Sequence, residues 1–253
     1  MASATVELKG PGEIGWMREA GRVVAETLNV LETAVRAGVS TLELDRLAGA
    51  EISRRKAKPA FLGYRGFPAT LCVSVNEEVV HGIPSPKRML REGDLVSLDL
   101  GAVVKGFYAD AALTVAVGKV SPEAERLMEV ARRSLAAGIR EARVDRRLGD
   151  VSRAVQETVE GQGMSVVREF VGHGIGRALH EDPAVPNYGR AGTGPRLSPG
   201  LVIAIEPMVT LGGPEVRVLA DGWTAVTADG TWAAHFEHTV AVAEDGPQIL
   251  TQA

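Results

Sequence analysis

Two apolar segments that each contain one aspartate place the strongest constraint on how this chain can fold. Residues 95–100 read LVSLDL and residues 108–117 read YADAALTVAV, so both have the composition of buried β-strands. They carry Asp99 and Asp110, and a buried carboxylate without a compensating partner is strongly destabilising. Either both aspartates face water, or a positive charge lies between them.

A hairpin between these segments would bring the two aspartates together. A turn at Lys105-Gly106 places Asp99 and Asp110 nearly opposite each other on one face of the hairpin. Opposed side chains are about 5 Å apart. Two negative charges at that spacing repel each other or raise the pKa of one carboxyl group strongly.

The second half of the chain contains the same anomaly. Glu206 ends the apolar run VIAIE, and Glu237 lies in the otherwise apolar segment AAHFEHTVAV. One such carboxylate alone is best explained as an edge-strand group that faces solvent. Four of them, two in each half, favour a site for cations. Two divalent cations and a hydroxide would leave the four charges nearly balanced, and ligation rich in oxygen favours Mn, Fe, Co or Zn at catalytic centres.

One imidazole is the usual further ligand in such a site, and His173 is the best candidate among the five histidines. It lies in EFVGHGIGRALHEDP, where flanking glycines allow backbone and ligand to approach closely. The glycines also suggest a phosphate-binding loop, but their spacing is not GxGxxG. For His81 and His180, a role in the site and a position in a surface loop both stay open. His235 and His238 flank Glu237, and we expect structural or outer-shell roles for them.

The order of elements repeats once along the chain. Helical periodicity predicts helices over 13–37, 40–56, 122–142 and 149–160, with Gly38 as the stop of the first. Strands are expected near 69–75, 95–100, 108–117, 165–171, 201–206, 222–228 and 235–242. The halves, roughly 13–118 and 121–245, suggest an ancient duplication. We expect an α+β fold with helices packed on antiparallel sheets about a pseudo-twofold axis, as a single catalytic domain over 1–253.

Composition excludes several other classes of protein. The net charge of −4 gives no sign of binding to nucleic acid or to an anionic membrane. Cys72 is the only cysteine, which excludes an intramolecular disulfide and a thiolate metal site and fits a reducing cytoplasm. The first residues contain no apolar signal segment, and no apolar run is long enough to span a bilayer. The basic clusters at 54–58 and 143–147 are read as solvated helix ends.

Five motifs in this sequence resemble the type I methionine aminopeptidases, which remove the initiator methionine from new chains. They are GYRGFPATLCVSVNEEVVHGIP at 63–84, LDLGAVVKGFYAD at 98–110, EFVGHGIGRALHEDPAVPNY at 169–188, IEPM at 205–208 and FEHTV at 236–240. The resemblance covers almost the whole chain. It implies the pita-bread fold, whose internal pseudo-twofold symmetry agrees with the repeat.

The resemblance assigns roles to the residues already singled out. Two divalent metal ions (Co, Mn, Fe, Zn or Ni) and an activated water that attacks the first peptide bond are implied. Asp110 and Glu237 would bridge both metals, Asp99 would chelate one, and His173 and Glu206 would complete the other. Glu206 would also act as general base.

Further residues would contact the substrate. The resemblance implies that His180 binds the developing oxyanion and that His81 contacts the scissile nitrogen. The pocket for the methionine side chain would be lined by Tyr64, Phe67, Cys72 and Trp223, although these aromatics also fit a role in capping a core. Two positions depart from the common bacterial pattern and leave the shape of the pocket open: they are Phe61 and Leu179.

Three alternatives fit part of the sequence. A proline-specific peptidase of the same fold usually carries an extra N-terminal domain, whereas the first helix here begins near residue 13. A non-catalytic relative would lack ligands, and all five are present. Type II methionine aminopeptidases carry an insertion between His180 and Glu206, which are only 26 residues apart here. We expect a cytoplasmic monomer that acts on nascent N-termini with possible transient ribosome contact; the metal and the tolerance at the second substrate residue stay open.

Overall fold

The helices lie where the periodicity predicts them. The computed structural model describes residues 6–253; residues 1–5, part of the segment in which no secretory signal is expected, lie outside the described residues. The helices are α1 (Pro11–Ala34), α2 (Thr41–Arg54), α3 (Pro122–Glu141), α4 (Leu148–Glu160) and the 3-10 turn η1 (Tyr64–Gly66). Within the described chain, no helix combines the length and apolarity needed to cross a lipid bilayer.

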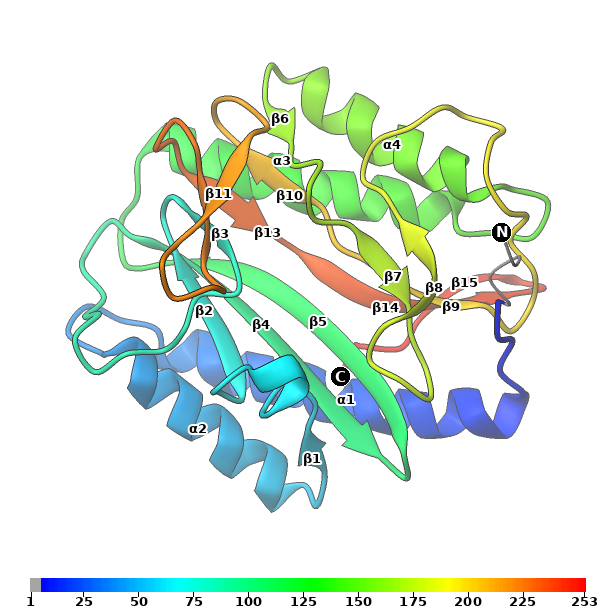
Figure 1. The fold of residues 1–253 in the computed structure, drawn as a ribbon, viewed down its shortest axis with the longest axis horizontal. Helices are drawn as coiled ribbons and strands as arrows, with labels where there is room; N and C mark the ends of the chain where they lie inside the picture. Colours follow the sequence, from blue (N-terminus) through cyan, green and yellow to red (C-terminus); the bar gives the residue numbers. More distant parts are fainter. Residues whose placement is uncertain (1–5) are drawn as a thin grey trace.

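One antiparallel sheet runs through the whole molecule (Figure 1). Its path is β1 (Lys58–Pro59), β4 (Leu95–Val104), β5 (Phe107–Ala116), β14 (Glu237–Ala243), β9 (Val202–Ile205), β7 (Gly172–Gly174) and β8 (Glu181–Val185), with β2 (Leu71–Val75) paired to β4 and β15 (Gly246–Ile249) to β14. Two smaller sheets have three strands each. The first has the order β13 (Ala233–His235), β10 (Met208–Thr210), β6 (Ser165–Val166). The second has the order β11 (Val216–Val218), β12 (Ala225–Thr227), β3 (Glu78–Val80).

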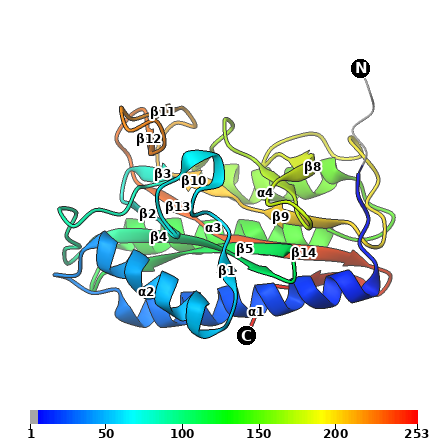
Figure 2. The same cartoon turned by 60° about the horizontal axis from the view of Figure 1, so that its bottom comes forward.

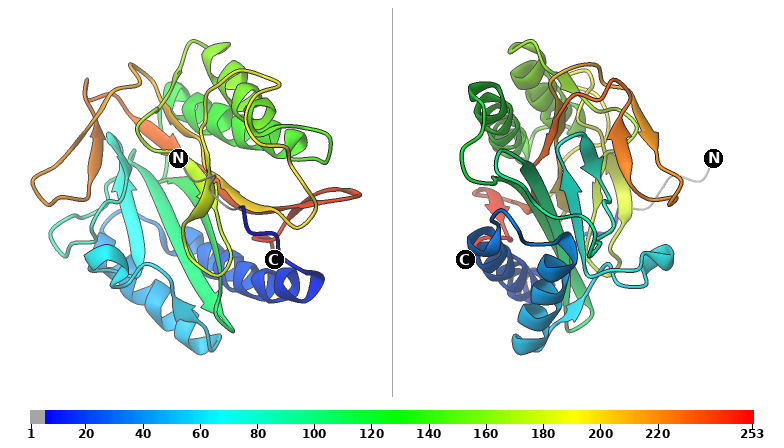
Figure 3. Two further views of the ribbon diagram at one scale, coloured as in Figure 1. Left: turned by 45° about the vertical axis from the view of Figure 1, so that its right-hand side comes forward. Right: turned by 90° about the vertical axis from the view of Figure 1, so that its left-hand side faces the viewer.

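The helices cover one face of the large sheet and leave the other face to loops (Figures 2 and 3). The pair α1 and α2 packs apolar side chains on β2 and β4, and the pair α3 and α4 packs on β9 and β14, which gives two separate cores. The halves meet where β5 pairs with β14, with Glu237 opposite Ala112. Two helices on antiparallel strands in each half were expected, but the halves share one continuous sheet rather than two.

Several boundaries differ from the prediction. The capping box of Ser40 and Glu43 begins α2 as expected, and Ser121 caps α3 before Pro122. However, α1 ends at Ala34, and Gly38 lies beyond it in a turn. The reason is local: the chain already leaves the helix at Val35, which has extended backbone angles.

The hairpin of the two aspartates forms around Lys105-Gly106, but its register differs from the expectation. Asp99 lies opposite Ala112, and Asp110 lies opposite Gly101. The two carboxylates are therefore diagonal neighbours two positions apart on one face, rather than directly opposed. The tight turn fixes this register, because Val104 pairs with Phe107 across it.

Strands of the second half are shorter than predicted. Of the segment expected as a strand over 165–171, only Ser165–Val166 forms one, β6; the next strand, β7, begins at Gly172, beyond that segment. The strand expected over 222–228 is reduced to β12, and the strand expected over 235–242 is interrupted at Phe236 between β13 and β14. In these apolar segments the chain leaves one sheet and enters another after a few residues. Their composition does not show where this change occurs.

The C-terminal segment crosses α1 at a glycine. A Cβ atom added to Gly21 would lie 2.1 Å from the carbonyl oxygen of Leu250. That segment is held in place because Leu250 N–H donates to Thr239 O at 2.9 Å. A hydrogen bond of 2.9 Å between His238 Nδ1 and Thr251 Oγ1 adds to this anchor. Gly21 therefore lets the end of the chain pack directly on the helix.

We expect Gly21→Ala to lower the free energy of unfolding by about 1–3 kcal/mol, because the new methyl group displaces the C-terminal segment. Gly15 lies in the same helix and is exposed, and a Cβ atom added there would meet nothing within 4 Å. Gly15→Ala is the matched control and should raise the free energy of unfolding by up to about 1 kcal/mol. Urea denaturation of both variants measures the two free energies of unfolding. Equal stabilisation by both substitutions would contradict the close packing of the C-terminal segment on Gly21.

Candidate metal centre

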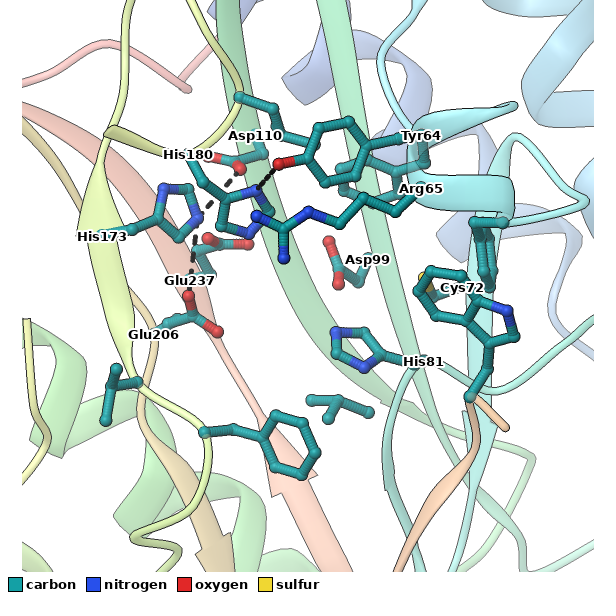
Figure 4. Close-up of a pocket in the computed structure, with 17 residues that line it drawn as sticks. Tyr64, Arg65, Cys72, His81, Asp99, Asp110, His173, His180, Glu206 and Glu237 are labelled. Atoms are coloured by element: carbon teal, nitrogen blue, oxygen red, sulfur yellow. Dashed lines mark hydrogen bonds and ion pairs between the residues drawn. The ribbon is translucent and has the colours of Figure 1, made fainter. Parts of the chain in front are cut away.

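A pocket of about 170 Å³ opens on the face of the sheet that carries no helices. Figure 4 shows side chains from both halves of the chain converging in it. All eleven residues predicted for the site line this pocket: they are Tyr64, Phe67, Cys72, His81, Asp99, Asp110, His173, His180, Glu206, Trp223 and Glu237.

Strand alternation brings the four carboxylates to the pocket. Leu98 and Leu100 of β4 point into the helix-covered core, so Asp99 between them points to the other face. The same argument applies to Asp110 on β5 and Glu237 on β14, while Glu206 follows the end of β9. Asp110 and Glu237 are only 2% and 3% exposed. The cluster thus stands on the strands that join the two halves.

The carboxylates strongly perturb one another. Burial, followed by repulsion from neighbouring carboxylates, raises the pKa values of Asp99, Glu206 and Glu237 well above their ordinary range. For Asp110, burial raises the pKa to about 6, against the opposing effects of His180 and Thr239. Thr239 Oγ1 donates a hydrogen bond to Asp110 Oδ1 at 3.0 Å. Without a cation, the protein therefore bears a large electrostatic cost here.

His173 on β7 faces this cluster. Its Nδ1 lies 2.9 Å from the carbonyl oxygen of Gly174, so Nδ1–H can donate there and leave the lone pair on Nε2. Nε2 lies 3.5 Å from Asp110 Oδ2 and 3.6 Å from Glu206 Oε1. Burial lowers the pKa of His173 to about 4, which favours the neutral imidazole that binds metals.

The donor set fits divalent cations. Ligand atoms of Asp110, His173 and Glu237 all lie within 4.8 Å of one another. In the described chain, the buried Oδ1 of Asp99 has no hydrogen-bond partner. Four carboxylates and one imidazole form the oxygen-rich set that divalent transition metals accept. We conclude that these residues could hold metal.

Two further histidines border the pocket. His180 Nδ1 lies 2.9 Å from the hydroxyl of Tyr64, and the two rings stack at 5.2 Å. Burial lowers the pKa of His180 to about 4, and the charges of neighbouring groups modify it further. His81 packs edge-on against Phe170 at 5.3 Å and Trp223 at 6.2 Å between ring centroids. Both imidazoles thus belong to the pocket rather than to a free surface loop.

An apolar recess adjoins the carboxylates. Phe67 and Trp223 meet edge-on at 5.1 Å, and the buried Cys72 packs with Phe67. Cys72 lies directly opposite Asp99 in the pairing of β2 with β4. Burial, with nearby carboxylates, raises the pKa of its thiol well above the usual value, so the group is neutral. A flexible apolar side chain would fit this lining.

The pocket also contains residues that the sequence reasoning did not predict: Arg65, Val80, Phe170 and Val171. Arg65 lies in GYRGFP, the start of the first motif that resembles the family, so the motif pointed to this loop but not to this side chain. Phe61 and Leu179, noted as departures from the family pattern, line the pocket as well. His235 does not line the pocket but contacts Glu206, with 3.7 Å between His235 Nε2 and Glu206 Oε2. His238 lies away from the cluster and contacts Thr251.

Comparisons with known proteins identify the family of this chain. The model of metallopeptidase family M24 matches residues 15–244. A methionine aminopeptidase of Clostridium acetobutylicum is 52% identical over 244 residues, which cover 96% of this chain and 98% of that protein. The chain belongs to the methionine aminopeptidases of metallopeptidase family M24. It is therefore a metallopeptidase, and family membership implies the use of divalent metal.

Solved structures of M24 enzymes share the fold. A methionine aminopeptidase of Thermotoga maritima superposes with a TM-score of 0.97 at 46% identity, covering 98% of this chain and 100% of that one. A prolidase of Pyrococcus furiosus gives a TM-score of 0.78 at 20% identity, covering 97% of this chain and 65% of the prolidase. The prolidase shows the shared fold alone. The pita-bread fold expected from the sequence is confirmed.

Replacing a ligand should have a different effect from replacing a neighbour. Asp110 lies at the centre of the donor set, so Asp110→Asn should weaken metal binding by more than the roughly 10–100-fold lost with an outer-shell partner. His180 is the control, because its side chain lines the same pocket but is not one of the five side chains assigned as ligands. His180→Ala should keep metal affinity close to wild type. Calorimetric titration of metal-stripped protein measures both, and equal loss would contradict the ligand assignment.

Proposed function

We propose that this protein removes the N-terminal methionine from nascent proteins and peptides when the second residue is small. The observation that carries the proposal is the position of the carboxylate cluster directly beside the apolar recess of Phe67, Cys72 and Trp223. A thioether side chain packs well against aromatic rings. A methionine side chain in this recess would place its own peptide bond at the cluster.

The proposed ligands are Asp99, Asp110, His173, Glu206 and Glu237. When bound, two divalent cations lower the pKa of water and polarise a carbonyl group. Family membership and the donor set support metal use, while the number of two and the identities Co, Mn, Fe, Zn or Ni belong to this proposal. The charge of four carboxylates supports two cations rather than one.

His180 is proposed to stabilise the negative charge that develops on the carbonyl oxygen. The hydroxyl of Tyr64 can donate to His180 Nδ1, which leaves the proton of the neutral ring on Nε2. That N–H can donate a hydrogen bond to the substrate. Glu206 is proposed as the general base, because its carboxylate lies in the pocket at the end of β9, beside the other proposed ligands.

His81 is proposed to contact the scissile nitrogen. Its backbone adopts a positive φ of 60°, which is uncommon for a residue with a side chain. The ring is held between Phe170 and Trp223, so it faces the same pocket as His180 from the opposite side (Figure 4). The free amino group of the substrate would lie near Asp99, which explains removal of a single residue.

The proposal includes the compartment, the oligomeric state and the partners of this protein. We infer cytoplasmic action on nascent N-termini by a monomer, with transient contact to the ribosome. The relatives named as methionine aminopeptidases support the substrate class, and the lone cysteine supports a reducing compartment.

The proposal predicts selectivity at the first two positions of a peptide. Metal-stripped enzyme reloaded with each divalent cation should release methionine from Met-Ala-Ser but not from Met-Lys-Ser or Met-Phe-Ser, because a long second side chain collides with the rim of the pocket. Leu-Ala-Ser tests the first position and should be a poor substrate. Chromatographic assay of released amino acid measures all four peptides.

The same assay on the variant His180→Ala tests the proposed role of His180 as a hydrogen-bond donor to the carbonyl oxygen. The substitution should lower kcat on Met-Ala-Ser by roughly 10²–10³-fold, the range for loss of one oxyanion donor. Equal cleavage of Met-Ala-Ser and Met-Lys-Ser by wild type would rule out the proposed role in maturation.

A further inference from the structure

Arg65 carries the only permanent positive charge among the described residues that line the pocket. It lies in η1, and Figure 4 shows its side chain extending beside His180 rather than away from the pocket. The side chain is exposed, so it retains access to solvent and to ligands. None of the roles proposed above uses this charge.

The backbone of Arg65 is held in an unfavourable conformation. Its φ of 48° and ψ of 23° lie in the left-handed region, between Gly63 and Gly66, whose φ angles are also positive. Backbone hydrogen bonds close the turn, from Gly63 N to Phe67 O at 2.8 Å and from Phe67 N to Tyr64 O at 2.9 Å. Residues with a Cβ rarely adopt these angles, and such strain is concentrated at functional sites.

Contacts place the guanidinium beside Tyr64, the residue that bonds to His180. Arg65 Cζ lies 5.3 Å from the centroid of the Tyr64 ring, and Tyr64 in turn binds His180. Figure 4 shows the guanidinium of Arg65 beside the imidazole of His180. The guanidinium of Arg65, at the rim of the pocket, therefore lies beside His180, the imidazole proposed to face the scissile carbonyl.

In the proposed function, the substrate chain that leaves the pocket would run near this charge. An extended peptide advances about 3.3 Å per residue, so the third Cα lies roughly 5 Å beyond the first peptide bond and the charged end of its side chain roughly 7 Å beyond it. That distance is shorter than the Debye length of about 8 Å at physiological ionic strength. With the second residue small, the third side chain is the first that can carry a charge near the rim.

We propose that Arg65 makes the enzyme selective for charge downstream of the cleaved bond, favouring an acidic side chain at the third position over a basic one. This inference rests on the proposed function. Attraction to one peptide and repulsion of the other, across a largely solvated gap of about 7 Å, should together give a preference of roughly five- to tenfold in kcat/KM.

The test compares Met-Ala-Asp-Ala with Met-Ala-Lys-Ala on wild type, Arg65→Asn and Arg65→Asp. Asn and Asp tolerate the left-handed conformation better than other residues with a Cβ, so the turn is kept. The ratio of kcat/KM for the acidic over the basic peptide should fall close to 1 in Arg65→Asn and invert in Arg65→Asp. In wild type the preference should shrink at about 0.5 M NaCl, where screening is strong.

Lys56 offers a matched control. It is an exposed cation with a φ of 57°, and it does not line the pocket. Lys56→Asp changes the net charge as Arg65→Asp does, and it should leave the ratio at the wild-type value. An unchanged ratio in both Arg65 variants, or an equal change in Lys56→Asp, would overturn the inference. The neutral peptide Met-Ala-Ser-Ala separates the cases, because failure of wild type to cleave it would overturn the proposed function and this inference together.

Discussion

Mutual repulsion among four buried or half-buried carboxylates is the constraint on which the structure of this protein depends. Asp110 and Glu237 lie on β5 and β14, the two strands that join the halves of the sheet. The seam of the fold is therefore also its least favourable electrostatic position. Cations at this seam would remove the repulsion and stabilise the contact between the halves, so that metal binding and folding are coupled.

The division of labour between the two faces of the sheet follows from this constraint. One face is covered by four helices and forms two apolar cores, which supply the rigidity that the site requires. The other face holds the pocket, where loops bring His180 and Arg65 to strands that already carry the carboxylates. Ligands on strands and substrate contacts on loops give a fixed centre with an adjustable rim.

Much of this arrangement was readable from the sequence. A carboxylate inside an apolar strand is costly, so Asp99 and Asp110 signalled a site before any geometry was known. The diagonal offset of this pair was not predicted, although it follows from the predicted turn: with Lys105 and Gly106 as turn residues, Val104 pairs with Phe107, and Asp99 therefore pairs with Ala112. Arg65 was missed for a different reason: an exposed arginine in a glycine-rich loop has no periodic pattern, and only the folded turn shows that it borders the pocket.

We propose that the carboxylate cluster holds two divalent cations. Crystals grown with Mn(II), with diffraction data collected on both sides of the manganese absorption edge, test it most directly. We expect two anomalous peaks per chain, both enclosed by Asp99, Asp110, Glu206 and Glu237, with His173 beside one of them. Peaks confined to the protein surface, or none within the cluster, would contradict it.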